Sequence, residues 1–276
     1  MTVRMVATDL DGTLLRSDNS VSERTRAALR AADDAGLLVA FVTGRPPRWL
    51  DQVVETTGHL GVAVGANGAV LYDLATETVL TVHHLDPAIL GPLTTDLRAA
   101  FPEVQFAGEY GDGFAAEPGY VHDWAINPLV DRRGRPIPAP LVTDVATIIT
   151  RPIVKLLAKD RAADADDFLD SAESIIGSRA SVTHSSSFGL LEIAAPGVTK
   201  ASGLAELAAS HGISAAEVVA IGDMPNDVPM LLWAGTSYAV ANAHPAAIEA
   251  AGAVVGSNED DAVATLIESL LTGRGS

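Results

Sequence analysis

Apolar runs and amphipathic segments alternate along the first 45 residues. Residues 3–7, interrupted by Arg4, and residues 37–42 are apolar runs of strand length. Between them, residues 22–34 carry apolar positions at helical spacing behind Ser22, a favoured helix N-cap. Strands that are apolar on both faces are typical of a parallel sheet with helices on both sides. The pattern therefore predicts a strand–helix–strand unit.

The next segment extends this unit. A second helix is expected over residues 47–57 and a strand over 62–64. Asn67-Gly68 is a strong turn signal, and the segments 69–72 and 78–83 that follow it indicate a hairpin. Turn chemistry is the more ordinary interpretation of Asn67.

The pattern changes between about residue 84 and residue 188. Helices are expected over residues 86–100 and 162–176, and an exposed loop rich in arginine and proline over 127–140. Short strands are expected over 104–107, 114–116, 153–158, 181–184 and 188–193. Strands and helices in runs, with irregular joins, predict an inserted α+β domain.

Regular alternation returns in the last third of the chain. Strands are expected over 218–221 and 238–240, and helices over 199–211, around 230–232, over 245–251 and over 261–271. The chain is therefore predicted to be an α/β protein with a parallel-sheet core. Residues 1–83 and 189–276 would form this discontinuous core, with residues 84–188 inserted as a second domain.

Composition narrows the possible functions. With 48% hydrophobic and 19% charged residues, the 276-residue chain has the make-up of an ordinary globular protein. Its net charge of −17 argues against nucleic-acid or anionic-membrane partners, which require excess lysine and arginine. Cysteine is absent, so thiolate chemistry and disulfides are excluded. No basic segment followed by a long apolar core opens the chain, which predicts a cytoplasmic protein.

Two carboxylates follow the first predicted strand. Asp9 and Asp11 are two residues apart, and in extended backbone such side chains share a face. They would project beyond the carboxyl end of the strand, where open α/β sheets bind ligands. Two like charges this close need a divalent cation, a shared proton or a positive side chain beside them.

Three further polar features are expected at the same edge of the sheet: Thr43, Lys200 and the group Asp223, Asn226 and Asp227. Each has an ordinary explanation in a strand end, a solvated first turn or a helix cap. A lysine at a helix start, however, opposes the helix dipole, which favours a functional role for Lys200.

Together these residues suit phosphoryl transfer. Oxygen ligands such as Asp9, Asp11 and Asp223 suit Mg²⁺. One carboxylate can attack phosphorus to form an aspartyl-phosphate, and the second can exchange a proton with the leaving group and then with water. Thr43 and Lys200 can hold the equatorial oxygens, and Lys200 and Mg²⁺ supply the positive charge that this acidic chain otherwise lacks.

Four motifs carry a family resemblance, and they occur in this order: Asp9-Leu10-Asp11-Gly12-Thr13-Leu14, Val42-Thr43-Gly44-Arg45, Gly197-Val198-Thr199-Lys200 and Gly222-Asp223-x-x-Asn226-Asp227-x-x-Met230-Leu231. Asn67-Gly68-Ala69 and Ala241-Asn242-Ala243 match lesser signatures. The chain resembles the haloacid dehalogenase superfamily, specifically its Cof-type phosphatases, over nearly its whole length. Only the insert carries little recognisable pattern.

The resemblance implies a Rossmann-like core with a mobile α/β cap of the C2 type. It implies that Asp9 is the nucleophile and a Mg²⁺ ligand, and that Asp223 is a further metal ligand. Asp11 would be the general acid and base, with its backbone carbonyl on the metal.

The same resemblance implies phosphate-binding and supporting residues. Thr43, Gly44 and Lys200 would bind phosphate with help from Asn226, and Asp227 would orient Lys200 or a metal-bound water. The family often has small residues where this chain has Met224-Pro225. We expect that difference to stiffen the turn without removing a ligand.

Substrate choice should lie with the cap, because the core motifs contact only phosphate. Polar or aromatic cap residues that could face the core, although each is more ordinarily a surface or packing residue, are Glu109, His122, Trp124, Arg151, Lys155 and Ser185 to Ser187.

The sequence thus predicts a Mg²⁺-dependent phosphatase acting on a small phosphorylated metabolite of the sugar-phosphate, flavin-precursor or nucleotide-phosphate class. A phosphotransferase or phosphomutase on the same core is the first alternative, and a phosphorylated acceptor in place of inorganic phosphate would identify it. A non-enzymatic phosphometabolite-binding protein is the second, but no catalytic carboxylate is missing. Nothing indicates an oligomeric state.

Overall fold

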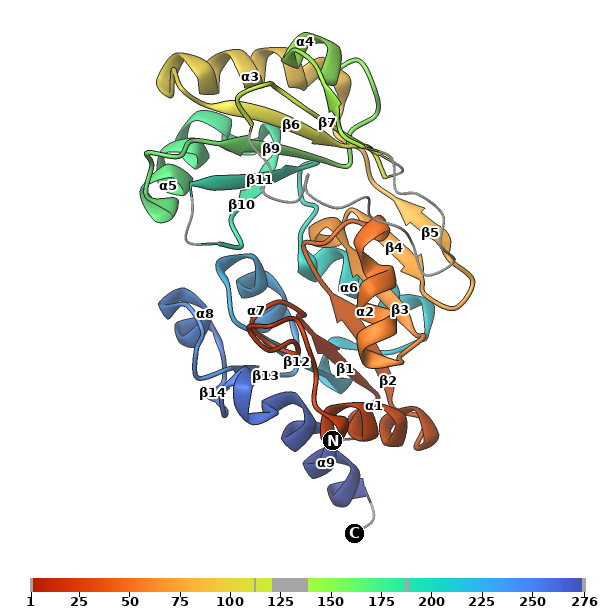
Figure 1. The fold of residues 1–276 in the computed structure, drawn as a ribbon. Coiled ribbons are helices and arrows are strands. Elements are labelled where there is room, and N and C mark those ends of the chain that lie inside the picture. Colours follow the sequence, from red (N-terminus) through yellow and green to blue (C-terminus); the bar gives the residue numbers. More distant parts are fainter. Residues whose placement is uncertain (1, 112, 121–138, 187–188, 275–276) are drawn as a thin grey trace.

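The computed structural model describes residues 2–111, 113–120, 139–186 and 189–274. The chain forms two bodies, each built on its own sheet (Figure 1). Within the described residues, none of the helices combines the length and the apolar character needed to cross a membrane.

The lower body in Figure 1 is the predicted parallel-sheet core. Its eight strands lie in the order β14-β13-β12-β1-β2-β3-β4-β5. Their bounds are β1 Met5–Thr8, β2 Leu38–Val42, β3 Val62–Gly65, β4 Val70–Asp73, β5 Thr78–Val82, β12 Val218–Gly222, β13 Thr236–Ala239 and β14 Ala253–Val254. The central strand β1 pairs in parallel with β2 and β12, whereas β4 and β5 form the expected antiparallel hairpin.

Helices cover both faces of this sheet because its strands are apolar on both faces. The helices are α1 Glu23–Asp34, α2 Leu50–Thr57, α6 Lys200–Ser210, α7 Val228–Trp233, α8 Pro245–Ala250 and α9 Ala262–Arg274. Val6 and Phe41 pack in the cluster that contains α1 and α9, whereas Met5 and Val42 pack in the cluster that contains α6 and α7. This arrangement confirms the predicted α/β fold class.

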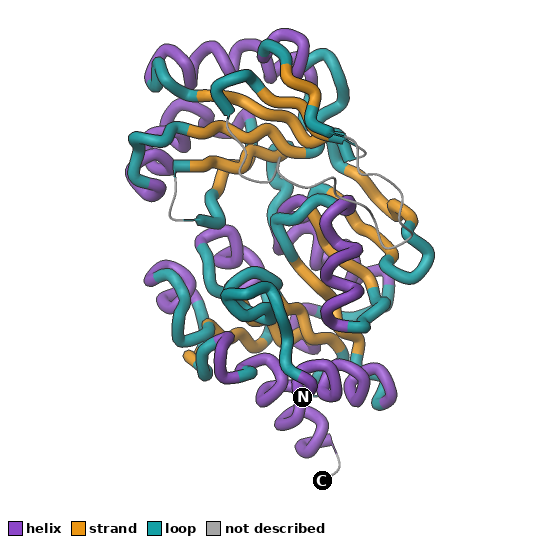
Figure 2. The backbone as a smooth tube through the Cα atoms, in the orientation of Figure 1, coloured by secondary structure: helices purple, strands orange, loops and turns teal. Residues whose placement is uncertain are grey.

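The second body is the inserted α+β unit. Its six strands lie in the order β10-β11-β9-β6-β7-β8, and every pair except β7 with β8 is antiparallel. The strands are β6 Gln105–Glu109, β7 Phe114–Ala116, β8 Leu141–Val142, β9 Lys155–Lys159, β10 Ser181–Thr183 and β11 Leu190–Ala194. The helices are α3 Pro87–Ala100, α4 Val145–Ile148 and α5 Ala165–Ile176. Figure 2 shows the strands of this body lying between its helices and the core, so the sheet itself faces the core.

The sheet pairing changes one predicted domain limit. We expected the core to resume at residue 189, but β11 (Leu190–Ala194) pairs with β9 and β10 in the second sheet. The strand expected over 188–193 is one of those predicted for the insert, so a limit at residue 188 separates it from its own sheet. We therefore propose residues 84–194 as the cap and residues 1–83 and 195–276 as the core.

The helices and strands that the sequence did not predict are short. The helix α4 and the two-residue strands β8 and β14 were not expected, because segments this short show no period. The predicted loop at 127–140 lies almost wholly outside the described residues, as do His122, Trp124 and Ser187.

Candidate active site

The predicted site residues meet where the parallel strands of the core end. Asp9 follows β1, Thr43 follows β2 and Asp223 follows β12, and these three strands are neighbours in the sheet. A cavity of about 340 Å³ opens there between the two bodies. Asp9, Asp11, Gly44 and Asn226 line it from the core side.

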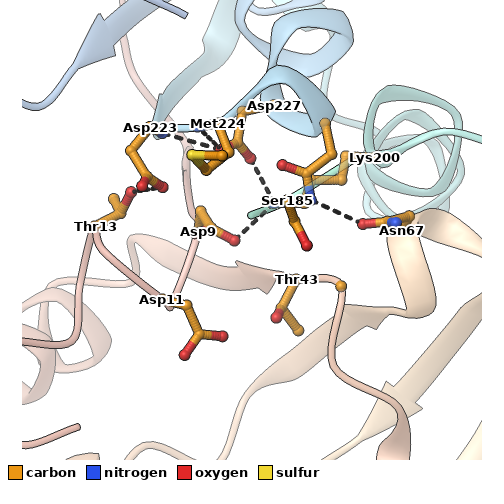
Figure 3. Close-up of polar contacts among 12 residues, drawn as sticks. Asp9, Asp11, Thr13, Thr43, Asn67, Ser185, Lys200, Asp223, Met224 and Asp227 are labelled. Carbon is orange, nitrogen blue, oxygen red and sulfur yellow. Dashed lines mark hydrogen bonds and ion pairs between the residues drawn. The ribbon is translucent and has the colours of Figure 1, made fainter. Parts of the chain in front are cut away.

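Lys200 forms the centre of the charged cluster. Its ammonium Nζ lies 2.6 Å from Asp9 Oδ1 and 2.5 Å from Asp227 Oδ1, and the lysine is only 1% exposed (Figure 3). Burial alone would lower the pKa of Lys200, but the charges of Asp227 and Asp9 outweigh it and hold that pKa above its usual range. The first-turn lysine is therefore a buried cation, and the solvated alternative is wrong.

Asp227 holds both Lys200 and the turn after β12. While Asp227 Oδ1 contacts Lys200, its Oδ2 accepts hydrogen bonds from the backbone N–H groups of Asp223 and Met224, both at 2.9 Å. The side chain fits beneath the turn because Gly222 has no Cβ, since a Cβ there would lie 2.5 Å from Asp227 Cγ. These contacts support the predicted role of Asp227 in orienting Lys200.

Asp223 is held by residues of the first motif. Its Oδ1 accepts a hydrogen bond from Thr13 Oγ1 at 2.9 Å. Gly12 has a φ of +78°, and a Cβ on it would lie 2.4 Å from Asp223 Oδ2. The glycine of the first motif is therefore needed twice, once for its left-handed backbone and once for the approach of Asp223.

The carboxylates of Asp9, Asp223 and Asp227 have ligand oxygens within 4.8 Å of one another. Burial and the charges of Asp227, Asp223 and Asp11 outweigh the opposing effect of Lys200 and raise the pKa of Asp9 well above its usual value. Burial and Asp227 likewise raise the pKa of Asp223 to about 6. One lysine cannot balance three carboxylates, so this cluster keeps an excess of negative charge. Buried carboxylate oxygens with such an excess suit a hard divalent cation.

This imbalance predicts an unusual stability change. A carboxyl whose pKa is higher in the folded than in the unfolded state opposes folding as the pH rises between these two values. We therefore expect Asp223→Asn to raise the Tm of the metal-free protein at pH 7.5 by several degrees, corresponding to about 1–3 kcal/mol. Thermal unfolding with excess chelator measures this shift.

The same samples provide the control. Adding Mg²⁺ should raise the Tm of the wild-type protein and leave that of Asp223→Asn nearly unchanged. A variant that melts below the wild-type protein in chelator would contradict the charge imbalance at Asp223.

Asp11 lines the same cavity as Asp9, as the sequence predicted, but its side chain has a different partner. The chain turns directly after Asp9, and Leu10 O accepts hydrogen bonds from the N–H groups of Thr13 and Leu15. The Asp11 side chain is 53% exposed and forms a two-point ion pair with Arg45, whose Nε lies 2.8 Å from Asp11 Oδ2. Asp11 thus lines the cavity apart from the buried carboxylates, and its assigned acid–base role stays a prediction.

Gly44 and Asn226 line the cavity, and Thr43 precedes Gly44 in the loop after β2. Thr43 is buried, and its Oγ1 accepts a hydrogen bond from Arg45 N at 3.0 Å. Asn226 is 4% exposed and donates from Nδ2 to Asn67 Oδ1 at 3.0 Å. Met224-Pro225 leaves the turn in place, with Asn226 at the cavity as expected.

Several predicted cap residues also reach the cavity. Glu109, Lys155 and Ser185 line it, whereas Arg151 lies over the ring of Tyr110 at 4.1 Å. Sequence reasoning missed the lining residues Arg45, Trp49, Tyr120, Lys159 and Glu192. Glu192 had a detectable signal, since it is the lone charged residue in an otherwise apolar strand.

Comparisons with known proteins agree with this arrangement. A family model of haloacid dehalogenase-like hydrolases matches residues 6–267. Phosphoglycolate phosphatase of Natronomonas pharaonis is 31% identical over 253 residues, covering 91% of each chain. The 5-amino-6-(5-phospho-D-ribitylamino)uracil phosphatase YwtE of Bacillus subtilis is 28% identical over 293 residues, covering 99% of each.

A solved structure shares the fold. SMU.1108c from Streptococcus mutans UA159 superposes with a TM-score of 0.83 at 21% identity, covering 98% of this chain and all of its own. The sheet order, the clustered carboxylates and the match across residues 6–267 lead to one assignment. The chain belongs to the haloacid dehalogenase-like hydrolase family.

Proposed function

We propose that this phosphatase hydrolyses small phosphate monoesters through an aspartyl-phosphate on Asp9, with Mg²⁺ as cofactor. The observation that carries the proposal is the buried Lys200, which holds Asp9 beside Asp223 at the wall of the cavity between core and cap. Such a site combines a nucleophile with fixed positive charge where a phosphoryl group would develop negative charge.

The first half-reaction forms a bond between Asp9 and phosphorus. Lys200 holds Asp9 Oδ1, which leaves the other carboxylate oxygen to attack. As the new P–O bond forms, the ester P–O bond breaks, and Asp11 at the cavity gives a proton to the leaving oxygen. Lys200, Thr43 and Asn226 hold the oxygens of the transferring group.

The second half-reaction reverses the role of Asp11. Asp11 takes a proton from a water molecule that attacks the aspartyl-phosphate, the bond from Asp9 oxygen to phosphorus breaks, and inorganic phosphate leaves. Mg²⁺, held by Asp9, Asp223 and the Asp11 carbonyl, would supply charge stabilisation for the phosphoryl oxygens.

The cavity supports a small substrate. Its volume of about 340 Å³ is at the lower end of the range for small-molecule sites. Trp49, Tyr120 and Leu157 form an apolar part of the lining, which favours a leaving group with a ring or carbon skeleton over a bare ion. Both relatives compared above are named for small phosphate esters. A cytoplasmic location stays a prediction.

A phosphate-release screen tests the proposal. The purified protein with Mg²⁺ should release inorganic phosphate from one or more members of a panel of sugar phosphates, flavin-precursor phosphates and nucleotides. Excess chelator should stop the release, and added Mg²⁺ should restore it.

The same screen separates the alternatives. Phosphate appearing on an acceptor instead of in solution would indicate a phosphotransferase. Release that continues in excess chelator would contradict the metal site, and no turnover with any ester would contradict the proposed function.

A further inference from the structure

A buried charged pair from the cap contacts the core beside the phosphate site. Glu192 on β11 and Lys155 on β9 are each 5% exposed, and their Oε2 and Nζ atoms lie 2.8 Å apart. Lys155 Nζ also donates to Gly44 O at 2.7 Å, and Glu192 Oε2 accepts from Asn67 Nδ2 at 2.5 Å. The pair therefore contacts two core loops, those that follow β2 and β3.

Glu192 is held as an anion. Burial opposes this state, but the charge of Lys155 and the hydrogen bonds from Lys155, Ser185 and Asn67 outweigh burial and lower the pKa of Glu192. An ionised carboxylate accepts hydrogen bonds and cannot donate one. Each group that contacts it must therefore present a donor.

Because Glu192 can only accept hydrogen bonds, it determines which way the side-chain amides of Asn67 and Asn226 must point. Asn67 must turn its NH₂ group toward Glu192, which leaves Asn67 Oδ1 as an acceptor. Asn226 must in turn present its own NH₂ group to Asn67 Oδ1, at 3.0 Å. Reversing either amide would place two acceptor oxygens against each other in a buried site, at a cost of about 1–3 kcal/mol.

The side-chain amide of Asn226 is thus oriented by Glu192, although the two residues are not in contact. One N–H of its NH₂ group is committed to Asn67, and its buried Oδ1 has no hydrogen-bond partner among the described residues. The orientation of this amide decides whether a donor or an acceptor is available at the cavity edge, and a phosphoryl oxygen requires a donor.

We propose that Glu192 is a positioning residue that orients the Asn226 amide through Asn67. The proposal rests on the proposed function, because it assigns the oriented amide to a phosphoryl group. Glu192 belongs to the cap sheet and Asn226 to the core. The Asn226 amide is therefore oriented for phosphate only when the cap lies against the core as in this structure. Arg48 of the core and Glu109 on β6 make a second contact of this kind, with Nη2 and Oε1 2.7 Å apart.

Two variants distinguish positioning from mere anchoring of the cap. Glu192→Gln keeps the size of the side chain but can donate as well as accept, so it no longer determines the direction of the amide chain. Asn67→Gly removes only the middle of the chain, leaves Lys155 with Glu192, and suits the left-handed backbone at this position, where φ is 56°. We expect each to lower kcat/KM for phosphate release by roughly 10–100-fold.

Glu117 provides the matched control. It is a second buried cap glutamate, but it contacts Arg98 and the Phe106 N–H within the cap. Glu117→Gln should therefore keep kcat/KM near the wild-type value. Wild-type activity in Asn67→Gly would show that Glu192 only anchors the cap, and would overturn the proposal.

Combining variants adds a stricter test. In an Asn226→Ala background, Glu192→Gln should cause no further loss, because its effect passes through the missing amide. Losses that multiply in the double variant would mean that Glu192 acts by another route.

An NMR measurement that requires no phosphate release tests the orientation of Asn226 independently of the proposed function. In protein labelled with ¹⁵N at asparagine, the side-chain amide signal of Asn226, identified by its loss in Asn226→Ala, should shift in Glu192→Gln and stay in place in Glu117→Gln. An unmoved signal would overturn the inference. A shifted signal in a protein that releases no phosphate would contradict the proposed function alone.

Discussion

Replacing Asp9 by asparagine should lower the rate of phosphate release by at least about 10³-fold, because the variant has no carboxylate oxygen to attack phosphorus. Asparagine retains the shape of the side chain and an oxygen for the hydrogen bond from Lys200. The assay compares the initial rates of the two proteins on the best substrate of the panel.

Folding should survive this substitution. The pKa of Asp9 is raised, so its ionised form opposes folding at neutral pH, and a neutral side chain relieves that effect. We expect a Tm at or above that of the wild-type protein in chelator. Asp34→Asn, the same change at an exposed position on α1, should leave both rate and Tm unchanged. Activity close to wild type in homogeneous Asp9→Asn, with its mass confirmed, would refute the assignment of the nucleophile.

Replacing Lys200 by methionine should affect stability and activity together. The substitution leaves Asp9 and Asp227 buried and facing each other without their cation, a loss worth about 3–5 kcal/mol for a buried pair. We expect the Tm to fall by roughly 10 °C and phosphate release to fall at least about 10²-fold. Thermal unfolding and initial rates measure the two effects.

A second variant separates these two effects. Adding Asp227→Asn to Lys200→Met removes one of the unpaired charges and should recover part of the lost Tm. It should not recover activity, because no cation faces the phosphoryl oxygens. If the double variant melts no higher than Lys200→Met, the buried charge imbalance is not the cause of the instability.

Local pattern was enough to predict the architecture around the site. Apolar runs of strand length alternating with amphipathic helices are a property of neighbouring residues, and they predicted β1, α1 and β2 within a few residues. Parallel strands of one sheet end at the same edge, so Asp9, Thr43 and Asp223 could be brought together before their contacts were known.

Side-chain direction at the strand ends was not predictable in this way. Asp9 and Asp11 both line the cavity, as expected, but Asp9 lies against Lys200 and Asp11, beyond the turn closed by Leu10 O, lies against Arg45. A turn has no period of its own. Which way each carboxylate points depends on partners 34 and 191 residues away in the chain.

The sequence by itself determined the fold class, the edge of the sheet that carries the chemistry and the residue types gathered there, because periodicity and motif spacing are local. Only the tertiary structure decided that β11 pairs with β9 and β10, that Lys200 pairs with two of the three clustered carboxylates, and that Glu192 reaches Asn67. The Glu192–Asn67 contact joins the two sheets, whereas the carboxylate cluster joins the ends of distant core segments. These contacts join residues far apart in the chain, and no pattern within either segment encodes which partner it will contact.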